Sequence, residues 1–110
     1  MVQMIDMSKE FDYKISAFHH TIEGYKIAPI LAEEGICGVM WADWWGFKQE
    51  AFDMVRENIA LTDYSGACAI IHSDDAIQVQ RLNQEIAKAM SAGNRTVSYT
   101  HLTLPTMIRV

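Results

Sequence analysis

The chain has 110 residues, of which half are hydrophobic, and a formal net charge of −5 at pH 7. This length allows one domain of modest size, and the apolar content is enough for a packed core, which excludes extensive disorder. The acidic balance disfavours nucleic acid and anionic membrane surfaces as partners, and the sequence shows no signal peptide and no apolar run of membrane-spanning length.

The first two predicted elements are a helix and a strand. Residues 1–11 predict a helix because Met, Ile and Phe side chains recur on one of its faces. The segment Tyr13–Phe18 (YKISAF) predicts a strand, and His19 and His20 follow at its end.

A second helix is predicted over Glu23–Glu34, with Gly35 as its stop. Pro29 fits this helix if it falls in the first turn, where a missing N–H matters little. The next segment, Ile36–Met40 (ICGVM), is continuously apolar, which is typical of a strand that is covered on both faces.

An aromatic segment, residues 41–48 (WADWWGFK), follows this strand. Its rings either pack over the end of the core or form the wall of a ligand pocket. The second interpretation makes Trp41, Trp44 and Trp45 candidate substrate-binding residues.

The third helix is predicted from about Glu50 or Val55 to Ser65, with Gly66 as its terminator. The strand that follows, Ala67–His72, is built from small and β-branched residues.

This third strand ends on Ser73, Asp74 and Asp75. Asp75 is a plausible N-cap for a last helix over roughly Ile77–Ala92, which leaves Asp74 as the candidate for chemistry. His72 lies two residues before Asp74 and shares its face of the strand; the favoured interpretation is a core histidine bonded to a neighbour.

One helix followed by three strand–helix units predicts an α/β fold with a parallel sheet and right-handed crossovers. In such folds ligands and metals sit at the carboxyl ends of the strands. The predicted site therefore combines His20 or His19 with Asp74, and only one of the two histidines is expected to face it, because adjacent strand residues point to opposite faces.

Both cysteines, Cys37 and Cys68, fall in predicted buried strands. Without a CxxC spacing, they are predicted to be reduced core residues rather than a disulfide or metal ligands. The chain also has no HxH, HExxH, GxSxG or glycine-rich phosphate loop.

The last segment, Thr96–Val110 (TVSYTHLTLPTMIRV), has no helical period and is rich in threonine. Its composition is compatible with a terminal strand, but it also resembles a translated adapter sequence, and it is expected to lie outside the fold as adapter-derived or disordered chain. The structural domain is accordingly predicted over residues 1–95.

Several runs in a fixed order carry a resemblance to a known family: AFHHTIEGYKIAPILAEEGI, WADWWGFKQEAFD, IIHSDD and QRLNQEIAKAM. Together they resemble the C-terminal part of imidazolonepropionase-like members of the amidohydrolase superfamily. The resemblance implies a partial (β/α)₈ TIM barrel, in which the three predicted strands are approximately strands 6–8.

The same resemblance implies a metal-dependent hydrolase acting on amide-type C–N bonds, with a divalent metal, zinc by expectation, as its cofactor. His20 matches a metal ligand of the family, and Asp74 matches the aspartate that binds metal and takes the proton from the attacking water. His19, His72 and the three tryptophans are implied only as substrate contacts. The substrate would be a small cyclic amide or a dipeptide.

The sequence also departs from the family pattern, because the first-strand HxH pair, the fourth-strand bridging residue and the fifth-strand histidine are absent. Zinc hydrolases use about three protein ligands, so the isolated chain is expected to be inactive. Open edges on the sixth and eighth strands are expected to favour self-association.

Two other interpretations remain. One is a truncated, non-catalytic product with no function of its own, and the other is a small flavodoxin-like binding domain. The second is disfavoured, because no phosphate loop is visible and three strands are few for a doubly wound sheet. The compartment is not determined, although relatives of this type are often exported.

Overall fold

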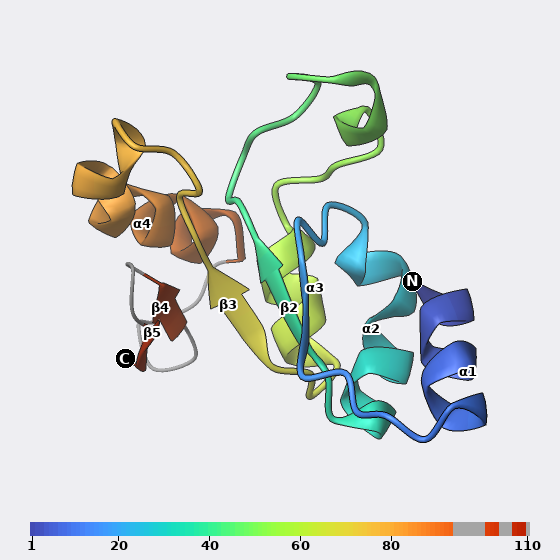
Figure 1. Cartoon of the computed structure of the whole chain (residues 1–110). Coiled ribbons are helices and arrows are strands. Elements are labelled where there is room, and N and C mark those ends of the chain that lie inside the picture. The colour runs from blue at the N-terminus through green and yellow to red at the C-terminus, as the bar shows by residue number, and fades with distance from the viewer. Residues whose placement is uncertain (94–100, 104–106, 110) are drawn as a thin grey trace.

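The computed structural model describes residues 1–93, 101–103 and 107–109 (Figure 1). In chain order the elements are α1 (Val2–Glu10), β1 (Ala17–His19), α2 (Gly24–Glu34), β2 (Cys37–Met40), the 3-10 helix η1 (Gln49–Ala51), α3 (Asn58–Tyr64), β3 (Ala69–Ile71), the 3-10 helix η2 (Gln78–Arg81), α4 (Leu82–Gly93), β4 (His101–Thr103) and β5 (Met107–Arg109). The predicted order of one helix and three strand–helix units is confirmed.

Strands β1, β2 and β3 form a small open parallel sheet in sequence order. In its register Ala17 lies opposite Cys37, and Gly38 lies opposite Ala69. Since all three strands run in one direction, their carboxyl ends lie at the same edge. The predicted α/β class with parallel strands is confirmed, and the open sheet is compatible with a piece of a barrel.

The helices cover one face of this sheet. In Figure 1, α3 lies behind β2 and β3, with α2 on one side, α4 on the other and α1 outermost beside α2. The main core cluster joins the sheet to α3 and α4 through Met40, Ala42, Ile59, Ala69, Ile71, Leu82, Ile86 and Ala89. A second cluster joins α1 and α2 to the sheet through Ile5, Leu31, Ile36 and Ala67. Of the helices in the described ranges, none is both long and apolar enough to cross a lipid bilayer.

Helix α2 accommodates Pro29 by a kink. Ile27 has non-helical backbone angles (φ −123°, ψ 15°), which divide the helix two residues before the proline. Pro29 thus stands in the first turn of the second part, where no hydrogen bond from its nitrogen is needed. Gly35 ends the helix in the left-handed conformation (φ 67°), as the sequence predicts.

Two predicted boundaries differ from the structure. The first strand begins at Ala17 rather than Tyr13, and the preceding residues form an exposed connection in which Asp12 has a positive φ of 53°. The predicted third helix is divided into η1 and α3, because Ala51 and Met54 pack against Ile22 and Trp41 instead of continuing along the sheet.

The prediction of reduced cysteines is wrong, because Cys37 and Cys68 form a disulfide. Cys37 opens β2, and Cys68 lies directly before β3, at the amino ends of the strands. The parallel register brings their Cα atoms to 4.4 Å, although 31 residues separate them in sequence. The two cysteines are close because their strands pair. A search for a CxxC spacing detects only cysteines that are near each other in sequence, so it could not reveal this disulfide.

Part of the segment expected outside the fold continues the sheet. β4 pairs with β3 in parallel, and β5 pairs with β4 antiparallel. β3 is therefore not the open edge that three strands alone would leave, whereas β1 stands at the end of the strand order among the described residues. Residues 96–100, 104–106 and 110 of the expected tail lie outside the described residues.

Candidate functional site

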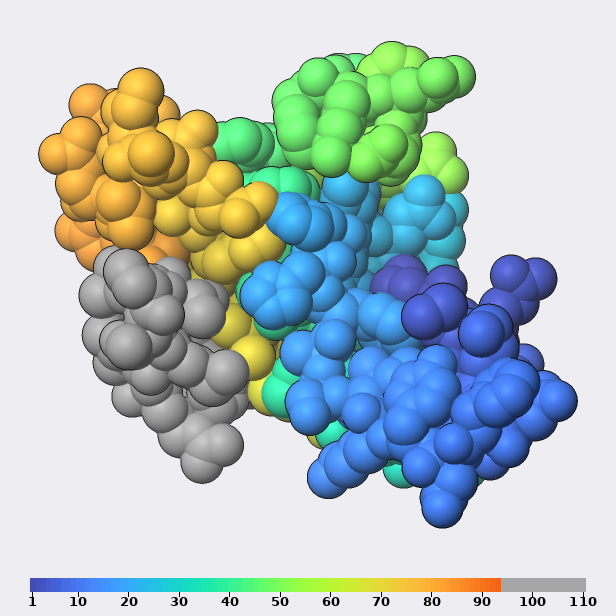
Figure 2. Space-filling model, viewed as in Figure 1, coloured from blue at the N-terminus to red at the C-terminus, as the bar shows by residue number. Residues whose placement is uncertain are grey.

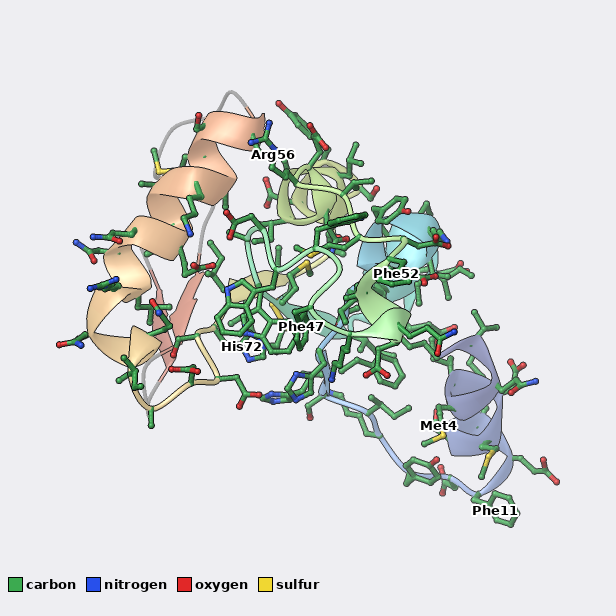
Figure 3. All side chains as sticks on the ribbon, turned by 90° about the horizontal axis from the view of Figure 1, so that it is seen from above. Met4, Phe11, Phe47, Phe52, Arg56 and His72 are labelled. Atoms are coloured by element: carbon green, nitrogen blue, oxygen red, sulfur yellow. A yellow bond between two sulfur atoms is a disulfide. The ribbon has the colours of Figure 1, made fainter. Side chains whose placement is uncertain are left out.

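The carboxyl ends of β1, β2 and β3 bring the sequence-predicted residues to one edge of the sheet. His20 follows β1, Trp41 follows β2, and His72 follows β3. Figure 3 looks down on this edge, where His72 and Phe47 lie near the centre and Arg56 lies apart, toward α3 and α4. The parallel register therefore assembles the site from three separate segments of the chain.

His20 and Asp74 are in direct contact at this edge. The His20 Nε2 lies 3.5 Å from the Asp74 Oδ2, with 44% and 52% of the two side chains exposed. Both residues have a positive φ, 58° for His20 and 46° for Asp74. Left-handed backbone at two non-glycine residues facing each other is uncommon, and such conformations concentrate at functional sites.

Both adjacent histidines stand near the site, which the alternation of strand residues did not predict. The His72 ring centroid lies 6.0 Å from that of His19 and 5.3 Å from that of His20. β1 ends at His19, and the left-handed conformation of His20 interrupts the extended backbone on which alternation depends. Of the two histidines, His20 makes the contact with Asp74.

His72 is buried beneath these rings. The residue is only 5% exposed, and its side-chain Nε2 has no hydrogen-bond partner. Burial lowers the pKa of His72 to about 4, against the opposing effect of Asp74 and with smaller contributions from His20 and His19. The imidazole is therefore neutral at pH 7 and holds an unused hydrogen-bonding nitrogen.

Trp41 forms the centre of the aromatic cluster. Its ring lies 4.8 Å from the His72 ring and 4.9 Å from the His20 ring, centroid to centroid. Trp44 stacks on it at 5.3 Å, and Phe47 meets it edge-on at 5.3 Å. The Trp41 Nε1 donates a hydrogen bond to the Ser73 carbonyl at 2.8 Å, which ties the end of β2 to the end of β3.

Trp45 does not join this cluster, although the sequence predicts it as a substrate contact. It is 63% exposed, stacks on Phe52 and donates its Nε1 hydrogen to the Phe52 carbonyl. The positive φ of Gly46 (69°) turns the chain within this loop. Figure 2 shows the loop, in green, standing out from the rest of the surface.

A shallow cavity of about 280 Å³ opens beside the two histidines of β1. Its lining residues are Met1, Phe18, His19, His20, Ile22, Glu23 and Glu50. A larger cavity of about 510 Å³ lies between the start of α3 and α4 and includes none of the sequence-predicted site residues. The smaller cavity is thus the one that leads to the candidate site.

Asn58 positions the turn that follows His20, and the sequence did not identify it. This fully buried side chain donates to the carbonyls of Thr21 and Ile22 at 2.9 and 3.0 Å, and its Oδ1 accepts the Tyr25 N–H at 2.8 Å. The sequence did contain a signal for a buried polar contact, because Asn58 interrupts the apolar face of its helix directly before Ile59.

Glu85 performs a similar task for the end of β2. It is 5% exposed, and its Oε2 accepts the Ala42 N–H at 3.1 Å, while Lys88 lies 3.2 Å from its other oxygen. A carboxylate beside Ile86 in the apolar stripe of α4 was the signal for such a contact. The backbone next to Trp41 is therefore held from α4.

Asp75 caps the turn after β3, as the sequence predicts. Its Oδ1 accepts the N–H groups of Ile77 and Gln78, both at 2.8 Å. This leaves Asp74 free of the capping role and directed at His20. Within residues 1–93 and the described strands β4 and β5, no group of three or more His, Cys, Asp or Glu side chains could hold a metal ion.

Comparisons with protein-family models, with curated proteins and with solved structures gave no match to this chain.

Proposed function

We propose that this chain is part of a metal-dependent hydrolase of the amidohydrolase superfamily, built on approximately strands 6–8 of a (β/α)₈ barrel. Its reaction would be hydrolysis of an amide-type C–N bond in a small cyclic amide or a dipeptide. The observation that carries the proposal is the contact between His20 and Asp74 at the carboxyl ends of two parallel strands.

The spacing of this pair fits a shared zinc ion. Zinc–nitrogen and zinc–oxygen bonds at a tetrahedral angle place two ligand atoms roughly 3.3–3.5 Å apart. The His20 Nε2 and Asp74 Oδ2 are 3.5 Å apart, so both could bind one cation without a change in the backbone. Imidazole and carboxylate are also ligands that zinc accepts.

The metal ion and the side chains have separate roles in the proposed reaction. A bound zinc-class ion supplies a nucleophile by lowering the pKa of its water to ~7. The Asp74 carboxylate would act as general base toward the attacking water and afterwards as general acid to the leaving nitrogen, which would let the amine depart uncharged. His19, His72 and the Trp41–Trp44 pair would contact the substrate.

The site offers two ligands where a hydrolytic zinc centre generally has about three. We therefore expect the chain alone to bind zinc weakly and to hydrolyse nothing. The missing ligands would come from barrel strands that this sequence does not contain.

Calorimetric titration with zinc chloride tests the proposed centre. We expect weak binding by the unaltered chain and no detectable binding by the His20→Gln and Asp74→Asn variants. Asp75→Asn is the matched control, because it removes the neighbouring carboxylate while asparagine still caps the helical turn. Zinc binding that survives both site substitutions would refute the centre, and tight stoichiometric binding would show that it is not incomplete.

A second candidate is a product without catalytic function. It follows from the departure of the sequence from the family pattern, since the HxH pair and the other expected metal ligands are not in this sequence. A chain of this kind should bind no zinc through His20 and Asp74. In the same titration, the unaltered chain and the two site variants should then give identical results.

A further inference from the structure

We propose that the cavity between the start of α3 and α4 binds a small zwitterion of the class of a free α-amino acid. Arg56 binds its carboxylate, and Glu57 binds its ammonium group. The lining of this cavity includes neither His20 nor Asp74. The inference therefore goes beyond the proposed function, and it is tested without a metal ion.

The first argument is the size and the shape of the cavity. Its volume is about 510 Å³, which lies within the range of roughly 300–1,000 Å³ that small-molecule sites occupy. Two alanines, Ala42 after β2 and Ala87 in α4, belong to its lining, and their short side chains leave room between the two segments. Their methyl groups also offer apolar contact to the carbon skeleton of a ligand.

The second argument is the charge that remains unpaired in this lining. Lys88 and Asp43 both line the cavity, but they form an ion pair at 3.2 Å, and Lys88 lies equally close to Glu85. Arg56 and Glu57 line the same cavity, and neither side chain makes an ion pair or a hydrogen bond within the part of the chain that the structure describes. One guanidinium and one carboxylate are therefore left for a ligand.

The position of Arg56 places its guanidinium at the cavity. In Figure 3 the Arg56 side chain extends from the segment before α3 toward the end of α4. Ser91, which belongs to α4, contributes a hydroxyl to the same lining. A guanidinium binds a carboxylate through two parallel N–H···O bonds, and a hydroxyl beside it can donate a further one.

The third argument is that a ligand with a single charge fits this lining poorly. An anion bound to Arg56 would bring its charge near the unpaired carboxylate of Glu57, and a cation bound to Glu57 would bring its charge near Arg56. Like charges placed side by side cost free energy, whereas a zwitterion satisfies both groups at once. The lining thus favours a ligand that carries both charges over one that carries either alone.

The Ala42 amide offers a reporter for this cavity. Its N–H donates to the Glu85 Oε2 at 3.1 Å, and the other oxygen of Glu85 lies 3.2 Å from Lys88. Ala42 and Lys88 both line the cavity, so a ligand charge placed there acts on both ends of this short chain of hydrogen bonds. A bound zwitterion should therefore change the chemical shift of the Ala42 amide.

Three matched probes test the charge requirement on the full chain. L-leucine carries both charges, 4-methylpentanoate lacks its ammonium group, and 3-methylbutylamine lacks its carboxylate. In ¹⁵N-labelled protein we expect L-leucine to shift the backbone amides of Ala42 and Ser91 and to leave that of Phe18, at the other cavity, unchanged. Each singly charged probe should bind at least about tenfold more weakly, because one charge-assisted contact is lost.

Substitutions assign the two charges. Arg56→Gln and Glu57→Gln should each weaken L-leucine binding at least about tenfold. Arg81→Gln and Glu10→Gln are the matched controls, because they remove the same charges from exposed positions outside the lining, and both should bind as the unaltered chain does. All four positions are exposed, so the midpoint of thermal unfolding should stay the same. Ala87→Leu fills the cavity and should abolish the shifts.

Several outcomes would overturn the inference. One is a singly charged probe that binds as tightly as L-leucine, and another is L-leucine binding that survives Arg56→Gln or Glu57→Gln. A third is the absence of any shift at Ala42 and Ser91 up to the solubility limit of L-leucine. If a variant fails to fold, the comparison of the three probes on the unaltered chain still decides, and none of these results depends on zinc binding by His20 and Asp74.

Discussion

Two buried polar side chains, Asn58 and Glu85, hold the backbone next to the candidate ligands. Neither residue lies at the strand ends itself, since Asn58 begins α3 and Glu85 belongs to α4. Each bonds to main-chain groups of a strand end more than 35 residues away in sequence, Thr21 for Asn58 and Ala42 for Glu85. The position of His20 and Trp41 is thus set by helices on the covered face of the sheet.

Replacing Asn58 by alanine should destabilise the fold. The substitution leaves the carbonyls of Thr21 and Ile22 and the N–H of Tyr25 without their partner in a buried site, and we expect a loss of ~2–3 kcal/mol. Urea unfolding followed by circular dichroism measures the change. Asn83→Ala on the exposed face of α4 is the control, and equal stability of the two variants would contradict the role of Asn58.

The pKa of His72 makes a second prediction at the residue scale. Burial lowers this pKa to about 4 in the folded chain, while the unfolded chain keeps the ordinary value near 6.5. Between these values the unfolded state binds more protons, so stability is fully present above pH ~6.5 and falls as the pH decreases toward 4. We expect a loss of ~3 kcal/mol across this window, since a difference of one pKa unit corresponds to about 1.4 kcal/mol.

Urea unfolding at several pH values between 7 and 4 measures this dependence. His72→Phe lacks the titrating group and should show a clearly shallower decline than the unaltered chain. Parallel curves for the two proteins would show that His72 does not contribute to the acid sensitivity.

At the scale of elements, the disulfide and the hydrogen bond of the Trp41 side chain both join β2 to β3. Cys37 joins Cys68 at the amino ends of the strands, and Trp41 bonds to Ser73 at their carboxyl ends. The two strands are therefore connected beyond their main-chain ladder at both ends. This arrangement fixes the position of Asp74, which follows β3, relative to Trp41, which follows β2.

Reduction of the disulfide should lower stability. The crosslink closes a loop with a sequence separation of 31 residues, for which chain entropy predicts a contribution of about 3–4 kcal/mol. Unfolding in urea with and without a phosphine reductant measures this effect. A variant in which both cysteines are alanine should not respond to the reductant, and identical curves for the unaltered chain under both conditions would argue against the crosslink.

At the scale of the whole molecule, the sheet is open and its helices lie on one face. β1 ends the strand order among the described residues, and an unpaired strand edge can pair with another chain. The loop with Trp45 and Phe52 adds exposed aromatic surface (Figure 2). Both features favour association between copies of the chain.

We expect the molar mass measured by light scattering after size-exclusion chromatography to rise with protein concentration. Ser16→Lys places a charge next to β1 and should reduce this rise, because lysines at an edge oppose strand pairing. Ser91→Lys adds the same charge on the exposed face of α4 and serves as the control. A monodisperse monomer that unfolds cooperatively at all concentrations would contradict the expectation.

The sequence predicted much of the fold because its signals are local. Helix stops at Gly35 and Gly66, short apolar strands and the cap at Asp75 depend on neighbours within a few residues, and the structure confirms these features. The alternation of strands and helices predicted the parallel sheet. A parallel sheet in turn predicted that the residues after β1 and β3 lie at one edge. The contact of His20 with Asp74 lies at that edge.

Other features depend on contacts between distant segments, and only the tertiary structure decided them. The disulfide, the hydrogen bonds of Asn58 and the unpaired nitrogen of His72 arise from strand register and helix packing over roughly 30 residues or more. The outward position of Trp45 depends on a glycine turn and on Phe52. A sequence pattern records which residues prefer to be buried, but the choice of burial partner is made by the whole chain as it packs.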